Sequence, residues 1–99
     1  MPYKVGTAAG VKDQLQTLLN LASLAGIRQF YLDAVDIMGR RLANDPLEWG
    51  DPLFRKPFVN GIVCRALVEP IMVHYSVHEL INSVIILKVE PLFEWRIRP

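Results

Sequence analysis

The fold is decided by residues 61–91, GIVCRALVEPIMVHYSVHELINSVIILKVEP, in which three runs rich in branched and aromatic residues follow one another closely. The runs are Gly61–Val68, Ile71–Val77 and Val84–Glu90, and the connections between them are too short for a helical crossover. Neighbouring runs must therefore pair antiparallel, which predicts a β-meander.

Alternation along these runs predicts one uniformly apolar sheet face and one mixed face. In the last run, strict alternation places Ile85, Leu87 and Val89 on the apolar face. The mixed face is expected to carry Val63, Arg65, Leu67, Met72, His74, Ser76, Lys88 and Glu90. Any chemistry on the sheet should lie on this mixed face.

Two helices are predicted before the sheet, because apolar residues there recur at spacings of three and four. The first begins near Ala8, with Thr7 as its N-cap, and Gly26 terminates it. The second extends from about Ile27 to Ala43. Its predicted inward stripe is Ile27, Phe30, Tyr31, Ala34, Met38 and Leu42.

Residues 44–59 are predicted to form a long connector, because prolines and a glycine interrupt every regular pattern there. The aromatic residues expected to pin it to the body are Trp49, Phe54 and Phe58.

The simplest arrangement of these elements is a single two-layer α+β domain over residues 1–99. Pro2–Thr7 supplies an N-terminal edge strand, and the helical hairpin packs on the apolar face of the antiparallel meander. The mixed face is left open. The predicted core is Leu15, Leu18, Phe30, Met38, Val73, Tyr75, Ile85 and Leu87.

Composition bears on association and location. A hydrophobic fraction of 52% in 99 residues leaves more apolar surface than one short chain can bury, which predicts a homodimer. The aromatic tail, Pro91–Pro99, is the expected contact.

The lone Cys64 excludes an internal disulfide and is interpreted as a small buried hydrophobe. With no signal peptide or membrane-spanning run, we expect a cytoplasmic protein.

Three segments carry a family resemblance. Ala-Asn-Asp-Pro at 43–46 ends the second helix, Val-His-Tyr-Ser-Val lies at 73–77, and Val-Ile-Ile-Leu-Lys-Val-Glu-Pro lies at 84–91. Together with the element order, they resemble the RelE/ParE toxin superfamily of type II toxin-antitoxin, plasmid-stabilisation-like proteins. The resemblance implies a toxin held inactive by a cognate antitoxin. RelE-like members cleave mRNA on the ribosome, whereas ParE-like members poison DNA gyrase.

The resemblance also implies site residues. Arg65 falls where RelE-like nucleases place a basic strand residue, but Met72 stands where their middle strand carries an arginine. The family's later histidine or tyrosine has no counterpart here, so the catalytic set is incomplete. The candidate catalytic residues are Arg65, His74 and Arg96, and the candidate substrate-binding residues are Arg98, Lys88, Arg55 and Lys56. No cofactor or metal is expected.

Alternatives stay open for several of these residues. His74 could act as acid or base in RNA cleavage, or could simply lie on a solvated sheet face. Lys88 and Glu90 are expected to form a salt bridge of little energetic weight. Arg40–Arg41 with Arg55–Lys56 could form a modest phosphate-binding patch.

The net charge of +1 gives no sign of nucleic-acid binding by itself. Two functions are therefore carried forward: an RNA endonuclease of a toxin-antitoxin system, and a non-catalytic interaction module, either gyrase-directed or a solitary inactive relative.

Overall fold

The computed structural model describes residues 2–56 and 61–91. The elements along these residues are β1 (Lys4–Thr7), α1 (Val11–Leu24), α2 (Arg28–Asn44), α3 (Pro46–Trp49), β2 (Asp51–Lys56), β3 (Gly61–Val68), β4 (Ile71–His78), η1 (Glu79–Ile81) and β5 (Ser83–Pro91).

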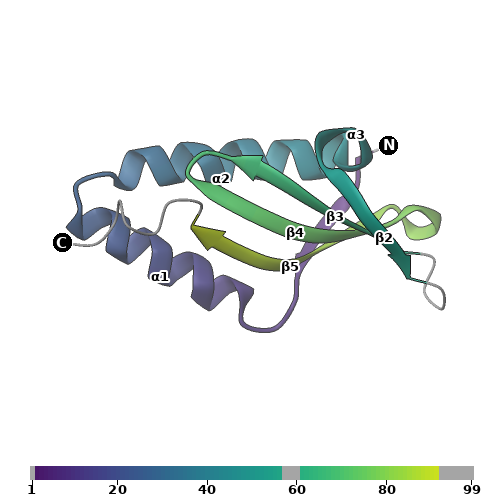
Figure 1. Ribbon diagram of the computed structural model, residues 1–99, viewed down its shortest axis with the longest axis horizontal. Helices are drawn as coiled ribbons and strands as arrows, with labels where there is room; N and C mark the ends of the chain where they lie inside the picture. Colours follow the sequence, from purple (N-terminus) through teal and green to yellow (C-terminus); the bar gives the residue numbers. More distant parts are fainter. Residues whose placement is uncertain (1, 57–60, 92–99) are drawn as a thin grey trace.

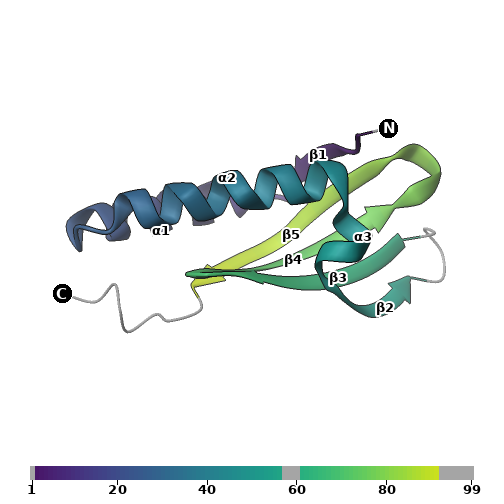
Figure 2. The same ribbon diagram turned by 90° about the horizontal axis from the view of Figure 1, so that it is seen from above.

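The strands form one five-stranded sheet in the order β1-β5-β4-β3-β2. β3, β4 and β5 pair antiparallel in succession, which confirms the predicted meander. β1 adds parallel to β5 at one edge, and β2 adds antiparallel to β3 at the other (Figure 1). α1 and α2 lie together on one face of the sheet (Figure 2). The two-layer α+β architecture is thus confirmed, with the opposite face not covered by any described helix.

The ends of α1 are set by two glycines. Gly10 is the N-cap with φ of 85°, and Gly26 follows the helix with φ of 76°, a region that favours glycine. The predicted termination at Gly26 is confirmed. The predicted N-cap at Thr7 is wrong, because Thr7 is the last residue of β1 and pairs with Ile86.

α2 buries a narrower stripe than predicted. Its buried residues are Tyr31, Ala34, Met38 and Leu42. Phe30 was expected on the same stripe but is 42% exposed. Neighbouring helical residues point about 100° apart, so only one of the two adjacent aromatic rings can face the sheet. Tyr31 takes that place, and Phe30 contacts the Tyr31 ring edge-on at a centroid distance of 6.4 Å.

β5 contains one residue more than β4 at the centre of their pairing. His74 lies opposite Lys88, but Tyr75 lies opposite Ile86, so Leu87 is the extra residue of a β-bulge. A bulge shifts the alternation of the strand by one residue. Before the bulge the even-numbered residues Val84 and Ile86 are therefore buried, and after it the odd-numbered Val89 is buried.

The strict alternation predicted for β5 is wrong over residues 84–87. Val84 and Ile86 are buried, at 0% and 4% exposure, whereas Ile85 and Leu87 are only partly buried. Beyond the bulge, Val89 is buried as predicted. The rest of the predicted core holds apart from Phe30: Leu18, Met38, Val73 and Tyr75 are buried, and Leu15 packs against them.

The predicted connector over 44–59 contains regular structure, namely α3 and β2. The prolines that suggested a loop are compatible with this helix and strand, since Pro46 is the first residue of α3 and Pro52 lies in an edge strand. Trp49 stacks on the Tyr75 ring at 5.9 Å, which confirms its predicted anchoring. Phe54 does not anchor the segment, because it is 57% exposed. Phe58 lies outside the described residues.

Tyr75 joins α3 to the sheet. Its hydroxyl donates a hydrogen bond of 2.5 Å to the Pro46 carbonyl oxygen. Gly50 passes so close that a Cβ there would collide with this hydroxyl and lie 2.9 Å from the Arg65 carbonyl oxygen. Only glycine can occupy this corner, through which the chain enters β2.

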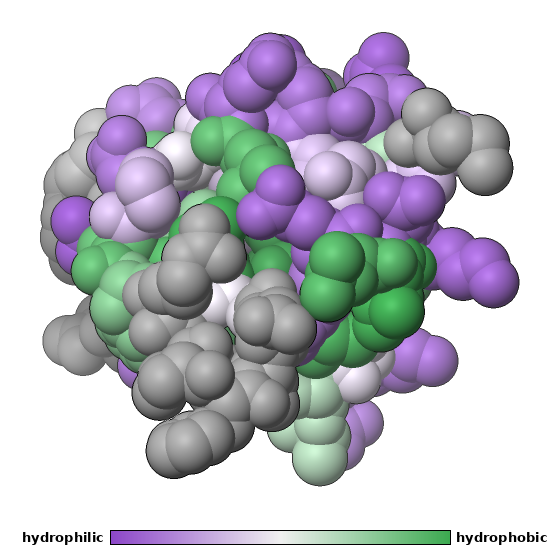
Figure 3. Space-filling view, turned by 90° about the vertical axis from the view of Figure 1, so that its right-hand side faces the viewer, coloured by the Kyte–Doolittle hydropathy of each residue, from purple (hydrophilic) through white to green (hydrophobic). Residues whose placement is uncertain are grey.

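Several large apolar side chains stay exposed, most of all Leu24, Leu80 and Ile81 at 87%, 79% and 70%. Leu80 and Ile81 belong to η1, and hydrophobic side chains gather at this end of the molecule (Figure 3). Within residues 2–56 and 61–91, no helix combines the length and apolarity needed to cross a membrane. The homodimer stays a prediction, since the tail expected to form it lies outside the described residues.

Replacement of Ile86 by alanine should lower the free energy of unfolding by about 2–5 kcal/mol, the range for truncating a buried isoleucine. Ile85→Ala is a matched control one residue away, and its partly buried side chain should cost less. Urea denaturation of both variants measures the difference. A larger loss in Ile85→Ala would contradict the bulged register of β5.

Tyr75→Phe should lower the free energy of unfolding by about 1–3 kcal/mol, because the buried Pro46 carbonyl loses its donor. Tyr31→Phe is the matched control. The Tyr31 hydroxyl is buried without a hydrogen-bond partner among the described residues, so its removal should be neutral or stabilising. Thermal unfolding compares the two variants, and equal losses would refute the anchoring function of Tyr75.

Candidate functional site

Three of the predicted site residues lie in one row across the open sheet face. Arg65 of β3 is directly opposite His74 of β4, and His74 is directly opposite Lys88 of β5. Directly opposed residues of antiparallel strands bring their Cβ atoms to about 4.5–5.5 Å. The row Arg65–His74–Lys88, which we call the basic row, is continued on β2 by Asp51 opposite Arg65.

Glu90 completes a charged cluster at one end of the basic row. Its carboxylate lies 3.6 Å from Lys88 Nζ, which confirms the expected salt bridge, and 3.8 Å from His74 Nδ1. His74 Nδ1 is buried and has no hydrogen-bond partner among the described residues. The side chains of His74 and Glu90 are 25% and 33% exposed, and Lys88 is 55% exposed. The site therefore combines one imidazole, His74, which is suited to proton transfer, with two cations, Arg65 and Lys88, which are suited to binding an anion.

Sequence reasoning missed two acidic features of this site. Glu90 was paired with Lys88 alone, although the register also brings it beside His74. Asp51 was assigned to a connector, so its pairing with Arg65 across β2 was not foreseen. The β4–β5 register would have indicated the contact of Glu90 with His74, and recognition of β2 as a strand would have indicated the pairing of Asp51 with Arg65.

The other predicted site residues are not brought into this row. Arg55 and Lys56 lie near the end of β2, where their backbones pair with Ile62 and Gly61. They are several residues along the sheet from Arg65. Arg96 and Arg98 lie outside the described residues, so their assignment stays a prediction.

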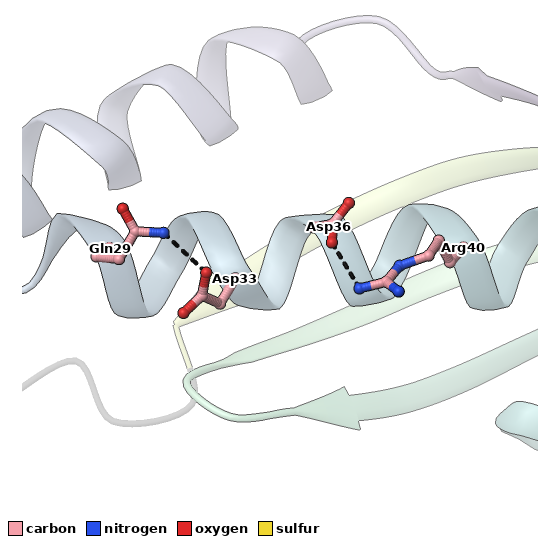
Figure 4. A network of polar contacts seen from close by, with 4 residues as sticks. All are labelled: Gln29, Asp33, Asp36 and Arg40. Atoms are coloured by element: carbon pink, nitrogen blue, oxygen red, sulfur yellow. Dashed lines mark hydrogen bonds and ion pairs between the residues drawn. The ribbon is translucent and has the colours of Figure 1, made fainter.

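The predicted phosphate patch at Arg40–Arg41 is not supported, because carboxylates of the same chain neutralise both arginines. Arg40 lies 2.6 Å from the Asp36 carboxylate, and Arg41 lies 2.8 Å from that of Asp45. Figure 4 shows the Asp36–Arg40 contact along α2. Both arginines belong to the helical layer rather than to the open sheet face.

A pocket of about 430 Å³ lies between α1 and the end of β5. Its charged lining is mixed, with Asp13 and Glu90 against Lys88. Gln14 accepts a hydrogen bond of 3.2 Å from the Val89 amide on the same edge. The pocket has two carboxylates for one cation, whereas the basic row has two cations, Arg65 and Lys88, for its two carboxylates, so the pocket is less suited to an anion. No cluster of three metal-ligating side chains occurs within the described residues.

Cys64 lies beneath the basic row, on the core side of β3. It is fully buried, which confirms its interpretation as a structural residue. Burial raises the pKa of its thiol, and a hydrogen bond with Tyr75 partly offsets that increase. A buried thiol with a raised pKa is a poor nucleophile. Cys64 therefore belongs to the core and not to the site.

This helical hairpin on one face of a five-stranded sheet is a RelE-like fold, as the resemblance implied, and solved structures show it. Among the solved structures that match over nearly the whole chain are two toxin-antitoxin complexes. The RelBE2 toxin-antitoxin complex of Mycobacterium tuberculosis matches with a TM-score of 0.68 and 21% identity, covering 92% of this chain and 99% of that chain. The archaeal RelE–RelB complex of Pyrococcus horikoshii OT3 matches with a TM-score of 0.62 and 22% identity, covering 95% and 99%. No protein-family model and no curated protein matches the sequence.

The raised pKa of Cys64 predicts a fall in stability at alkaline pH. The thiol of the unfolded chain loses its proton near pH 8.5, before the folded one does. Above that pH the unfolded state binds fewer protons, so the free energy of unfolding decreases as pH rises. Urea unfolding at pH 7.5 and 9.5 should show a larger decrease for the wild type than for Cys64→Ala. Equal decreases would mean that the thiol ionises alike in both states.

Proposed function

We propose that this chain is the toxin of a toxin-antitoxin pair and that its open sheet face cleaves RNA. The observation that carries the proposal is the basic row on a RelE-like fold, in which Arg65 and Lys88 flank His74. The neighbouring solved structures are a toxin-antitoxin complex and a RelE–RelB complex, which supports a RelB-like antitoxin as partner. By the family resemblance, the substrate is mRNA on the ribosome and the location is the cytoplasm.

The chemistry proposed is transesterification within RNA. The 2′-oxygen attacks the adjacent phosphorus, an O2′–P bond forms, and the bond to the 5′-oxygen breaks, giving a 2′,3′-cyclic phosphate. His74 takes the 2′-hydroxyl proton, and the leaving 5′-oxygen takes one from water. The imidazolium then returns its proton to the hydroxide that remains. No metal or cofactor is needed for this balance.

The two cations of the basic row have a separate task in this proposal. Arg65 and Lys88 neutralise the phosphate oxygens as negative charge builds up during attack. Glu90, 3.8 Å from His74 Nδ1, stabilises the imidazolium after proton transfer. Arg96 and Arg98 make further phosphate contacts, and Lys56, at a register position of the open face opposite Gly61, binds a more distant part of the RNA. Arg55 is at a register position of the other face, opposite Ile62, and has no part in this proposal.

An interaction module without catalysis is the second candidate, and two apolar residues favour it. Leu67 is 57% exposed and lies opposite Met72 on the open face, beside the basic row. An apolar pair with one exposed and one partly buried side chain suits a protein surface such as gyrase better than a phosphate backbone.

Induced expression of the chain in bacteria should arrest growth, with cleaved mRNA in the arrested cells. Arg65→Ala should reduce RNA cleavage by about 10²–10³-fold and relieve the arrest, because a donor to the developing charge is lost. Arg40→Ala is the matched control, since Arg40 is an exposed arginine of the helical layer. Circular dichroism checks that each variant folds.

Two outcomes separate the candidates. Arrest without RNA cleavage, unchanged in Arg65→Ala, would reject the nuclease and favour the interaction module. Release of the arrest by co-expression of a neighbouring antitoxin gene would support the toxin assignment independently of the chemistry.

A further inference from the structure

An aromatic side chain outside the hydrophobic core lies beside the basic row. Phe54 of β2 is 57% exposed, although a phenylalanine usually gains from burial. It is opposite Val63, which is two residues from Arg65 along β3. Residues two apart on a strand share a face, so Phe54 lies on the same face as the basic row.

A second β-bulge puts Phe54 there. Pro52 is opposite Cys64, but the next pair joins Phe54 to Val63, so Leu53 is the extra residue. Without it, Leu53 would take the place opposite Val63, and Phe54 would turn to the other side of the sheet. Bulges are common next to active sites, where they re-aim a side chain.

We propose that Phe54 is a stacking platform for one nucleobase of single-stranded RNA bound along the basic row; this rests on the proposed function. Phe54 is displaced from Arg65 by roughly 7 Å along the strands, the rise of two residues, and by about 5 Å across to the next strand. The base and phosphate of one nucleotide, with the reach of an arginine side chain, cover this distance. Unpaired bases stack on aromatic rings with little regard to sequence. Leu67, on the other side of the row, is equally exposed but offers no aromatic face.

Fluorescence anisotropy with a labelled single-stranded RNA decamer, 2′-O-methylated throughout so that it cannot be cleaved, tests the proposal. Phe54→Ala should weaken binding about 5- to 150-fold, the range for loss of one stacked base. Phe54→Trp should bind like the wild type, whereas Phe54→Leu should bind like Phe54→Ala. Phe30→Ala is the matched control, an exposed phenylalanine on the helical layer.

A 2-aminopurine base in the decamer gives a second readout, since stacking on a ring quenches its fluorescence. Quenching should be present with the wild type and Phe54→Trp and absent with Phe54→Ala. Wild-type affinity in Phe54→Ala, with binding lost in Arg65→Ala, would overturn the stacking proposal and leave the RNA function standing. No binding of the decamer by the wild type would overturn both.

Discussion

The extra residue in β5 is the constraint on which both the core and the open face depend. Residues 84–87 are all apolar, and charged and apolar residues then alternate. With unbroken alternation, burial of Ile86 would also bury Lys88, and an amine buried without a partner costs on the order of several kcal/mol. Because Leu87 is extra, Ile86 and Val89 both face the helices while Lys88 lies opposite His74 on the open face. The bulge therefore makes the core and the basic row compatible.

The far edge of the sheet depends on Tyr75 in a comparable way. Its hydroxyl holds α3 through the Pro46 carbonyl, and its ring lies under Trp49. The close passage of Gly50 then fixes where β2 begins, so that Asp51 meets Arg65. An edge strand with few pairing residues would otherwise be free to shift its register. A buried residue of β4 thus determines which β2 side chains border the basic row.

The sequence could predict those parts of the structure in which polar residues interrupt apolar runs or a short turn fixes the pairing. The two-residue connection Glu69–Pro70 sets the register of β3 and β4, and Arg65 and His74 stand out as polar residues within apolar runs. Which residues of β5 face the helices could not be predicted, because residues 84–87 are all apolar and either alternating set could be the buried one. β2 was hidden by Pro52, which an edge strand tolerates, and by the prolines on either side of it. Phe54 was consequently expected to pack inward, and its place on the open face depends on a bulge that leaves no mark in composition.

On the open face, as in the chain as a whole, positive and negative charges nearly balance. Asp51 lies opposite Arg65, and Glu90 lies within 4 Å of Lys88 and His74, so the cations of the open face are balanced before any ligand arrives. A partly exposed ion pair such as Lys88–Glu90 contributes about 0–1 kcal/mol, so a phosphate that replaces the carboxylate loses little. A face of this kind has weak long-range attraction for nucleic acid and a correspondingly shallow salt dependence. On the proposed function, RNA affinity must then come from short-range contacts, namely a few positioned cations and an aromatic ring, rather than from the net charge of the protein.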